Sequence, residues 1–124
     1  MSLDPDPKSS IPLVISGSLN ALKAAYDERS VKRFVATSSS ASVYNPLDEP
    51  GEMVTQDTWN EIAIREAWKD PPYEPERGMM VYAAGKAQAE KGIWRFHKEH
   101  RHERSDLVVN TSEQPLDHCQ LSRY

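Results

Sequence analysis

The sequence predicts an α/β fold in which a long helix connects two parallel strands. Three observations support this: a β-branched, apolar run at residues 31–37, an apolar helical stripe within residues 80–100, and a brief apolar run at residues 106–110. Strand, helix and strand in this order favour a right-handed crossover between parallel strands. We therefore expect a parallel sheet of about two strands flanked by helices.

Composition fits one soluble domain with a modest core. The chain has 124 residues, of which 38% are hydrophobic and 27% charged. A net charge of -4 provides no basic surface for nucleic acid. The apolar run at residues 11–15 is far shorter than a membrane-spanning helix and lacks the basic flank of a signal peptide. We expect a cytoplasmic protein that binds neither nucleic acid nor membranes.

The first helix is predicted to follow the extended, proline-containing residues 4–8 and to run to about Asp27. Ser9 or Ser10 can cap it, and Pro12 suits a first helical turn. Its apolar face repeats at helical spacing, in the order Ile15, Leu19, Leu22 and Tyr26.

The strand at residues 31–37 is expected to be buried, and it opens into Ser38, Ser39 and Ser40. Polar side chains at the end of a strand suggest a functional site. The proline-rich residues 44–78 then follow, with only residues 57–69 plausibly helical. There Asp57 could cap the helix, and the residues expected to pack are Trp59, Ile62 and Ala63.

The second long helix is predicted over about residues 80–100. One face carries the repeating residues Tyr82, Lys86, Ala89, Ile93 and Phe96. After Thr111 the sequence becomes polar without periodicity. We predict a domain over residues 1–111 and a divergent, disordered tail over residues 112–124.

Tyr82 and Lys86 are the candidates for chemistry, because they lie one turn apart on this face and should both point inward. A lysine ammonium stabilises a neighbouring phenolate, which suits the tyrosine for proton transfer to a carbonyl oxygen, and a strand-end serine could also donate to that oxygen. With five tyrosines and seven lysines, about 0.3 such pairs would arise by chance. An amphipathic helix with a snorkelling lysine is the structural alternative.

A metal site is not expected. His97, His100 and His102 have no acidic or cysteine partner at a convincing spacing, so we interpret them as part of a solvated, cationic helix end. Lys98, Arg101 and Arg104 belong to the same end and also suit the helix dipole. The single cysteine, Cys119, cannot form an internal disulfide.

Several segments together resemble the extended short-chain dehydrogenase/reductases of the NAD-dependent epimerase/dehydratase family. The similarity is closest to the dihydroflavonol reductase-like group, which includes aldehyde and ketone reductases. It spans about residues 4 to 111 and is carried by residues 17–25, 31–39, 57–61, 73–78, 81–90 and 94–96, in the family's order and spacing.

The resemblance implies part of a Rossmann-type sheet and a Ser-Tyr-Lys set that reduces a carbonyl substrate with hydride from NADP or NAD. Tyr82 would be the general acid, and Lys86 would stabilise its phenolate and bind the nicotinamide ribose. Ser39 would orient the substrate carbonyl, or Ser40 if the match is made through Val43 and Tyr44. The residues at positions 44–78 that could line the substrate pocket, or merely pack, are Trp59, Trp68 and Tyr73.

The sequence also departs from the family. None of its five glycines forms the G-x-G-x-x-G turn that approaches a dinucleotide pyrophosphate, and the match begins after the strands that would bind most of the cofactor. Gly85 stands where the family often has serine, and the match is lost after Thr111. The alternative is a truncated, catalytically silent relative that forms homo- or hetero-oligomers through exposed helices, or has no specific activity.

Overall fold

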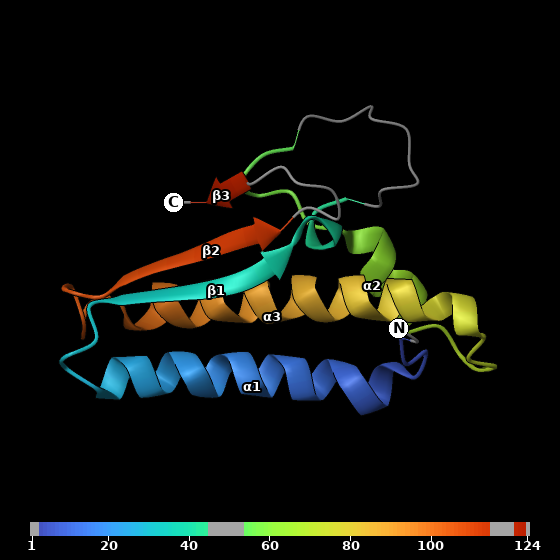
Figure 1. Ribbon diagram of the computed structural model, residues 1–124, viewed down its shortest axis with the longest axis horizontal. Helices are drawn as coiled ribbons and strands as arrows, with labels where there is room; N and C mark the ends of the chain where they lie inside the picture. Colours follow the sequence, from blue (N-terminus) through green and yellow to red (C-terminus); the bar gives the residue numbers. More distant parts are fainter. Residues whose placement is uncertain (1–2, 45–53, 115–120, 124) are drawn as a thin grey trace.

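The computed structural model describes residues 3–44, 54–114 and 121–123. They form a sheet in the order β1-β2-β3, with its helices on one side (Figure 1). Helices α1 and α3 run in the same direction beside each other, opposite to β1 and β2. In the described part, no helix is both long and apolar enough to cross a membrane.

Helix α1 spans Pro7–Asp27 and ends where the sequence predicts. Its start differs, because Asp6 is the N-cap: the backbone N–H of Lys8 donates to Asp6 Oδ1 at 2.9 Å. The prediction of Ser9 or Ser10 as the cap is therefore wrong. An aspartate before a proline at the first helical position satisfies a free backbone donor and starts the helix earlier.

Strands β1 (Arg33–Ser39) and β2 (Val108–Gln114) pair in parallel from Arg33↔Val108 to Ser39↔Gln114. Helix α3 connects them through the expected crossover, so the α/β prediction is confirmed. Strand β1 is less buried than predicted, because Phe34 and Ala36 on its inner face are only half-buried against the core. Val35 and Val108 are 53% and 46% exposed, because the described helices cover the other face.

Beyond Thr111, β2 continues to Gln114, and the short β3 (Leu121–Arg123) pairs with it in an antiparallel manner. Cys119 lies outside the described residues. The domain boundary predicted at residue 111 stays a prediction.

Helix α2 spans only Glu61–Ala67, four residues later than predicted. Asn60 caps it, with its Oδ1 accepting from the Ala63 N–H at 2.9 Å. Asp57 is therefore not the cap. It lies in a separate turn before the helix, where Thr58 Oγ1 accepts from the Thr55 N–H at 2.8 Å. Ile62, which was expected to pack, is 47% exposed, whereas Ala63 is fully buried.

Helix α3 spans Gly78–His100, after a 3-10 turn, η2, at Pro75–Arg77. Residues of α3, α1 and the sheet meet in the main core. It comprises Ile93 of α3, Leu22 and Tyr26 of α1, Val109 of β2 and the preceding Leu107. Gly85 is buried within the uninterrupted helix. The long helix and its apolar face are thus confirmed.

The C-terminal end of α3 is less solvated than predicted. Tyr26 forms a hydrogen bond between its hydroxyl and His97 Nδ1 at 2.7 Å, and the His100 ring stacks on Phe96 with centroids 4.0 Å apart. Burial lowers the pKa of His97, with a further contribution from Arg101. The prediction of a solvated helix end is therefore wrong for His97 and His100, which are half-buried, whereas His102 is exposed. It is also wrong for Arg104, which is 2% exposed.

Candidate active site

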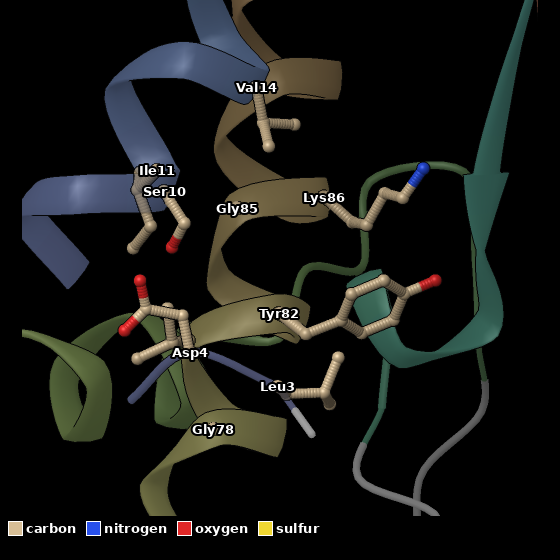
Figure 2. A pocket seen from close by; sticks show the side chains of 10 residues that line it. Leu3, Asp4, Ser10, Ile11, Val14, Gly78, Tyr82, Gly85 and Lys86 are labelled. Atoms are coloured by element: carbon tan, nitrogen blue, oxygen red, sulfur yellow. The ribbon is translucent and has the colours of Figure 1, made fainter. Parts of the chain in front are cut away.

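Tyr82 and Lys86 lie one turn apart near the start of α3, and both are half-buried. Lys86 Nζ lies 6.0 Å from the centroid of the Tyr82 ring. Both side chains extend from α3 toward the end of β1, away from α1 (Figure 2). The two side chains therefore share one side of α3, as their spacing predicts.

The ammonium of Lys86 is held at the sheet. Its Nζ donates to the backbone carbonyl of Thr37 at 3.2 Å, immediately before the serines at the end of β1. One such bond leaves two of the three ammonium N–H donors for other acceptors. The inward lysine is therefore anchored to the strand and retains capacity to bind a polar group.

The ring of Tyr82 is positioned by small apolar residues. It packs against a cluster formed by Ala41, Ala63 and Ala83, which come from the 3-10 turn η1 (Ser40–Ser42), α2 and α3. Asn60 ties two of these elements together, because its Nδ2 donates to the Ala41 carbonyl and its N–H donates to the Ser42 carbonyl, both at 2.9 Å. Helix α2 thus supports the turn next to the tyrosine.

Residues 38–42, here called the serine segment, form the end of β1 and the turn η1, and all five are buried. Ser38 and Ser42 donate their hydroxyls to Glu90 Oε2 at 2.6 and 3.3 Å. Ser39 Oγ instead accepts from the Ala41 N–H at 3.3 Å. The hydroxyls of Ser38 and Ser42 are therefore directed to α3.

The two candidate catalytic serines differ in hydrogen bonding. Accepting from Ala41 orients the Ser39 hydroxyl and leaves its own proton to donate. The Ser40 hydroxyl is buried with no hydrogen-bond partner among the described residues. Neither is hydrogen-bonded to the Tyr82 hydroxyl in the described structure, so the structure brings the residues to neighbouring elements without joining the predicted set directly.

A cavity of about 160 Å³ lies on the other side of Tyr82 and Lys86, between the N-terminal residues, α1 and α3. Leu3, Asp4, Ser10 and Ile11 line it, while the polar ends of Tyr82 and Lys86 lie toward β1 (Figure 2). This cavity is therefore not the space between the two reactive groups.

The three aromatic residues expected to line a substrate pocket do not gather in this cavity. Trp68 is 42% exposed and donates to Gln88 Oε1 at 3.1 Å. Lys91 Nζ lies 5.7 Å from the Trp59 ring centroid, and the Arg77 guanidinium carbon lies 5.1 Å from the Tyr73 ring centroid. Their role as pocket walls stays a prediction.

Sequence reasoning missed two supporting residues. Glu90 lies four residues after Lys86 and eight after Tyr82, so its helical spacing placed it on the same side of α3. Asn60 stands before a run of good helix formers, as N-caps often do. Apart from Ala63 and Trp94, the partners of these two residues named here are 18 or more residues away in sequence, and no local pattern reveals those contacts.

The chain is similar in sequence to several known proteins. An NAD-dependent epimerase/dehydratase of Aspergillus terreus is 46% identical over 111 residues, which cover 90% of this chain and 32% of that protein. Aldehyde reductase 2 of Sporidiobolus salmonicolor is 41% identical over 88 residues, which cover 70% of this chain and 26% of that protein. An anthocyanidin reductase of Vitis vinifera is 36% identical over 96 residues, covering 76% and 26%.

The chain spans about a third or less of the length of these relatives. No family model matches it.

Proposed function

Since the chain belongs to the NAD-dependent epimerase/dehydratase family of short-chain dehydrogenase/reductases, we propose that it carries the proton-transfer groups of a nicotinamide-dependent aldehyde or ketone reductase. The observation that carries this proposal is the direction of Tyr82 and Lys86. Both extend from one turn of α3 toward the strand end that supplies Ser39 and Ser40.

In the proposed reaction, Tyr82 donates its phenolic proton to the carbonyl oxygen of the substrate. Negative charge develops on that oxygen during reduction, and a hydrogen bond from Ser39 stabilises it. The Lys86 ammonium, anchored on the Thr37 carbonyl, stabilises the phenolate that remains. A bound nicotinamide cofactor supplies the hydride.

The residues present fit one end of such a cofactor. Lys86 has two N–H donors left after its bond to Thr37, which suit the hydroxyl groups of the nicotinamide ribose. For the pyrophosphate, the sequence contains no G-x-G-x-x-G turn, and no described glycine has a positive φ. This chain's own residues therefore fit the ribose next to the nicotinamide, with either NADP or NAD.

The test is a fluorescence titration of the purified chain with NADPH and NADH, followed by turnover assays with a panel of aldehydes and ketones. We expect a change in cofactor fluorescence, and loss of turnover in Tyr82→Phe with binding retained. Tyr26→Phe is the matched control, because it removes a phenol hydroxyl that bonds His97 at the opposite end of α3 from Tyr82. Absence of both binding and cofactor oxidation in the unmodified chain would contradict the proposal.

Association through the helices is a second candidate function, favoured by exposed apolar residues on α1 and α3. Leu13 is 71% exposed, and Val14 and Met79 are 37% and 40% exposed. Light scattering of the purified chain, by itself or mixed with a longer homologue, should show a mass above that of the monomer. Leu13→Glu should reduce this mass, whereas Val35→Glu, on the opposite side of the sheet, should not. A monomeric mass under all these conditions would refute this candidate.

A further inference from the structure

Glu90 is a buried carboxylate that contacts three elements around the candidate site. Its relative exposure is 2%, and it lies one turn after Lys86 on α3. Beyond the bonds from Ser38 and Ser42, its Oε1 accepts from Thr111 Oγ1 at 2.8 Å and from Trp94 Nε1 at 3.4 Å. The carboxylate thus connects the end of β1, η1 and β2 to the helix that carries the proposed proton donor.

The arrangement around Ser39 and Ser40 is specific. Ser38 and Ser42 stand on either side of them, and both donate to the same oxygen atom, Glu90 Oε2. Burying a carboxylate is costly unless hydrogen bonds replace its hydration, and a fully bonded polar network fixes the positions of its members. Glu90 Oε2 on α3 therefore holds both the first and the last residue of the serine segment.

We infer that Glu90 is a positioning residue. It acts through Ser38 and Ser42 to hold the hydroxyls of Ser39 and Ser40 at a fixed position relative to Tyr82. This inference rests on the proposed function, because it assigns Glu90 a purpose in proton transfer. Glu90 and Tyr82 lie on one helix, so the hydrogen bonds from Ser38 and Ser42 to Glu90 fix the position of the turn η1 relative to Tyr82. Small misplacements of a reacting group can lower rates about 100-fold.

The test compares two ways of removing hydrogen bonds from the same carboxylate. Ser38→Ala/Ser42→Ala releases the serine segment, whereas Thr111→Val removes the contact with β2 and leaves the segment bound. In the full chain, we expect the double variant to lower kcat for NADPH-dependent reduction by about 10- to 100-fold with little change in the KM for NADPH. Thr111→Val should keep kcat within about threefold of the value for the unmodified chain, even if it lowers the Tm as much as the double variant does.

Backbone hydrogen exchange provides a readout that does not require turnover. The Val43 and Tyr44 amides donate to the Ser40 carbonyl at 3.0 and 3.2 Å, so they report on η1. We expect these amides to exchange about tenfold faster or more in the double variant, and to be unchanged in Thr111→Val.

Glu90→Gln, which keeps shape and one carbonyl acceptor, should recover most of the kcat that Glu90→Ala loses. If Glu90→Ala does not fold, the serine variants decide the question. Equal effects of the double variant and Thr111→Val on exchange and kcat, or none, would overturn the inference. An unmodified chain that neither binds nor oxidises the cofactor would refute the proposed function instead. Faster exchange of the Val43 and Tyr44 amides in the double serine variant alone would then still show that Glu90 holds the serine segment.

Discussion

Arg104 closes the C-terminal end of α1, with its Nη1 donating to the Tyr26 carbonyl at 2.7 Å. The guanidinium also donates to the carbonyls of Ala25, Glu28 and Val31 and to the Asp106 carboxylate. The hydrogen bonds that Asp106 accepts from Arg104 and from Lys32 hold the pKa of its carboxyl well below its usual range. One buried side chain thus joins α1, the turn before β1 and the turn before β2.

We therefore predict that Arg104→Met lowers the Tm by roughly 5 °C or more, because several carbonyls at the helix end lose their donor. Arg101→Met is the control, since Arg101 is exposed at the same end of α3. Thermal unfolding followed by circular dichroism measures both. Equal Tm values for Arg104→Met and the unmodified chain would show that these bonds add no net stability.

Two helical glycines should respond oppositely to alanine. A Cβ at Gly17 would meet no atom within 4 Å, so Gly17→Ala should raise the free energy of unfolding by about 0.5–1 kcal/mol. At Gly78 a Cβ would lie 2.6 Å from the Leu3 carbonyl oxygen, so Gly78→Ala should lower that free energy or displace the N-terminal residues. Urea unfolding gives both values, and stabilisation by Gly78→Ala would contradict the close packing of Leu3 on α3.

Stability should also depend on His97 at mildly acidic pH. Burial lowers the pKa of His97 in the folded state, so the unfolded chain binds the proton more readily. The contribution of neutral His97 is complete above the ordinary histidine pKa of about 6.5 and is lost as pH falls below it. We expect His97→Gln to reduce the fall in the free energy of unfolding between about pH 7 and 5. The control His102→Gln should show the same fall as the unmodified chain. An unchanged pH profile in His97→Gln would exclude His97 as its source.

Alanine substitutions should distinguish the two candidate serines. If Ser39 orients the substrate carbonyl, Ser39→Ala should lower kcat by about 100-fold or more, because one hydrogen bond to the developing charge is lost. Ser40→Ala removes a buried hydroxyl without a partner in the described residues and should leave kcat nearly unchanged and stability equal or higher. The reverse result would assign the role to Ser40. Steady-state kinetics with circular dichroism controls provides the comparison.

The long elements follow from sequence because their periodicity is local. Helices α1 and α3 and the start of the parallel sheet agree with the repeats of apolar residues and with the crossover order. Tyr82 and Lys86 share a face for the same reason. The start of α2 could not be predicted as well, since Asp57, Thr58 and Asn60 all suit a cap and tertiary contacts with Ala41 favour Asn60.

Long-range partners account for the other differences. His97 and His100 look like a solvated helix end until Tyr26, 71 residues away from His97, covers one of them. Glu90 reads as a charged position in a helix, and its neutral partners come from β1, η1 and β2. Hydrogen bonds between elements this far apart leave no repeat in the chain.

The anchor of Lys86 has an evolutionary consequence. Its acceptor at residue 37 is a main-chain carbonyl, which every amino acid provides. The side chain at this position can therefore drift among relatives without moving the ammonium, provided that the strand is preserved. Position 37 should then tolerate substitution and position 86 should not, although Lys86 Nζ lies 3.2 Å from the carbonyl oxygen of residue 37, so the two positions need not covary.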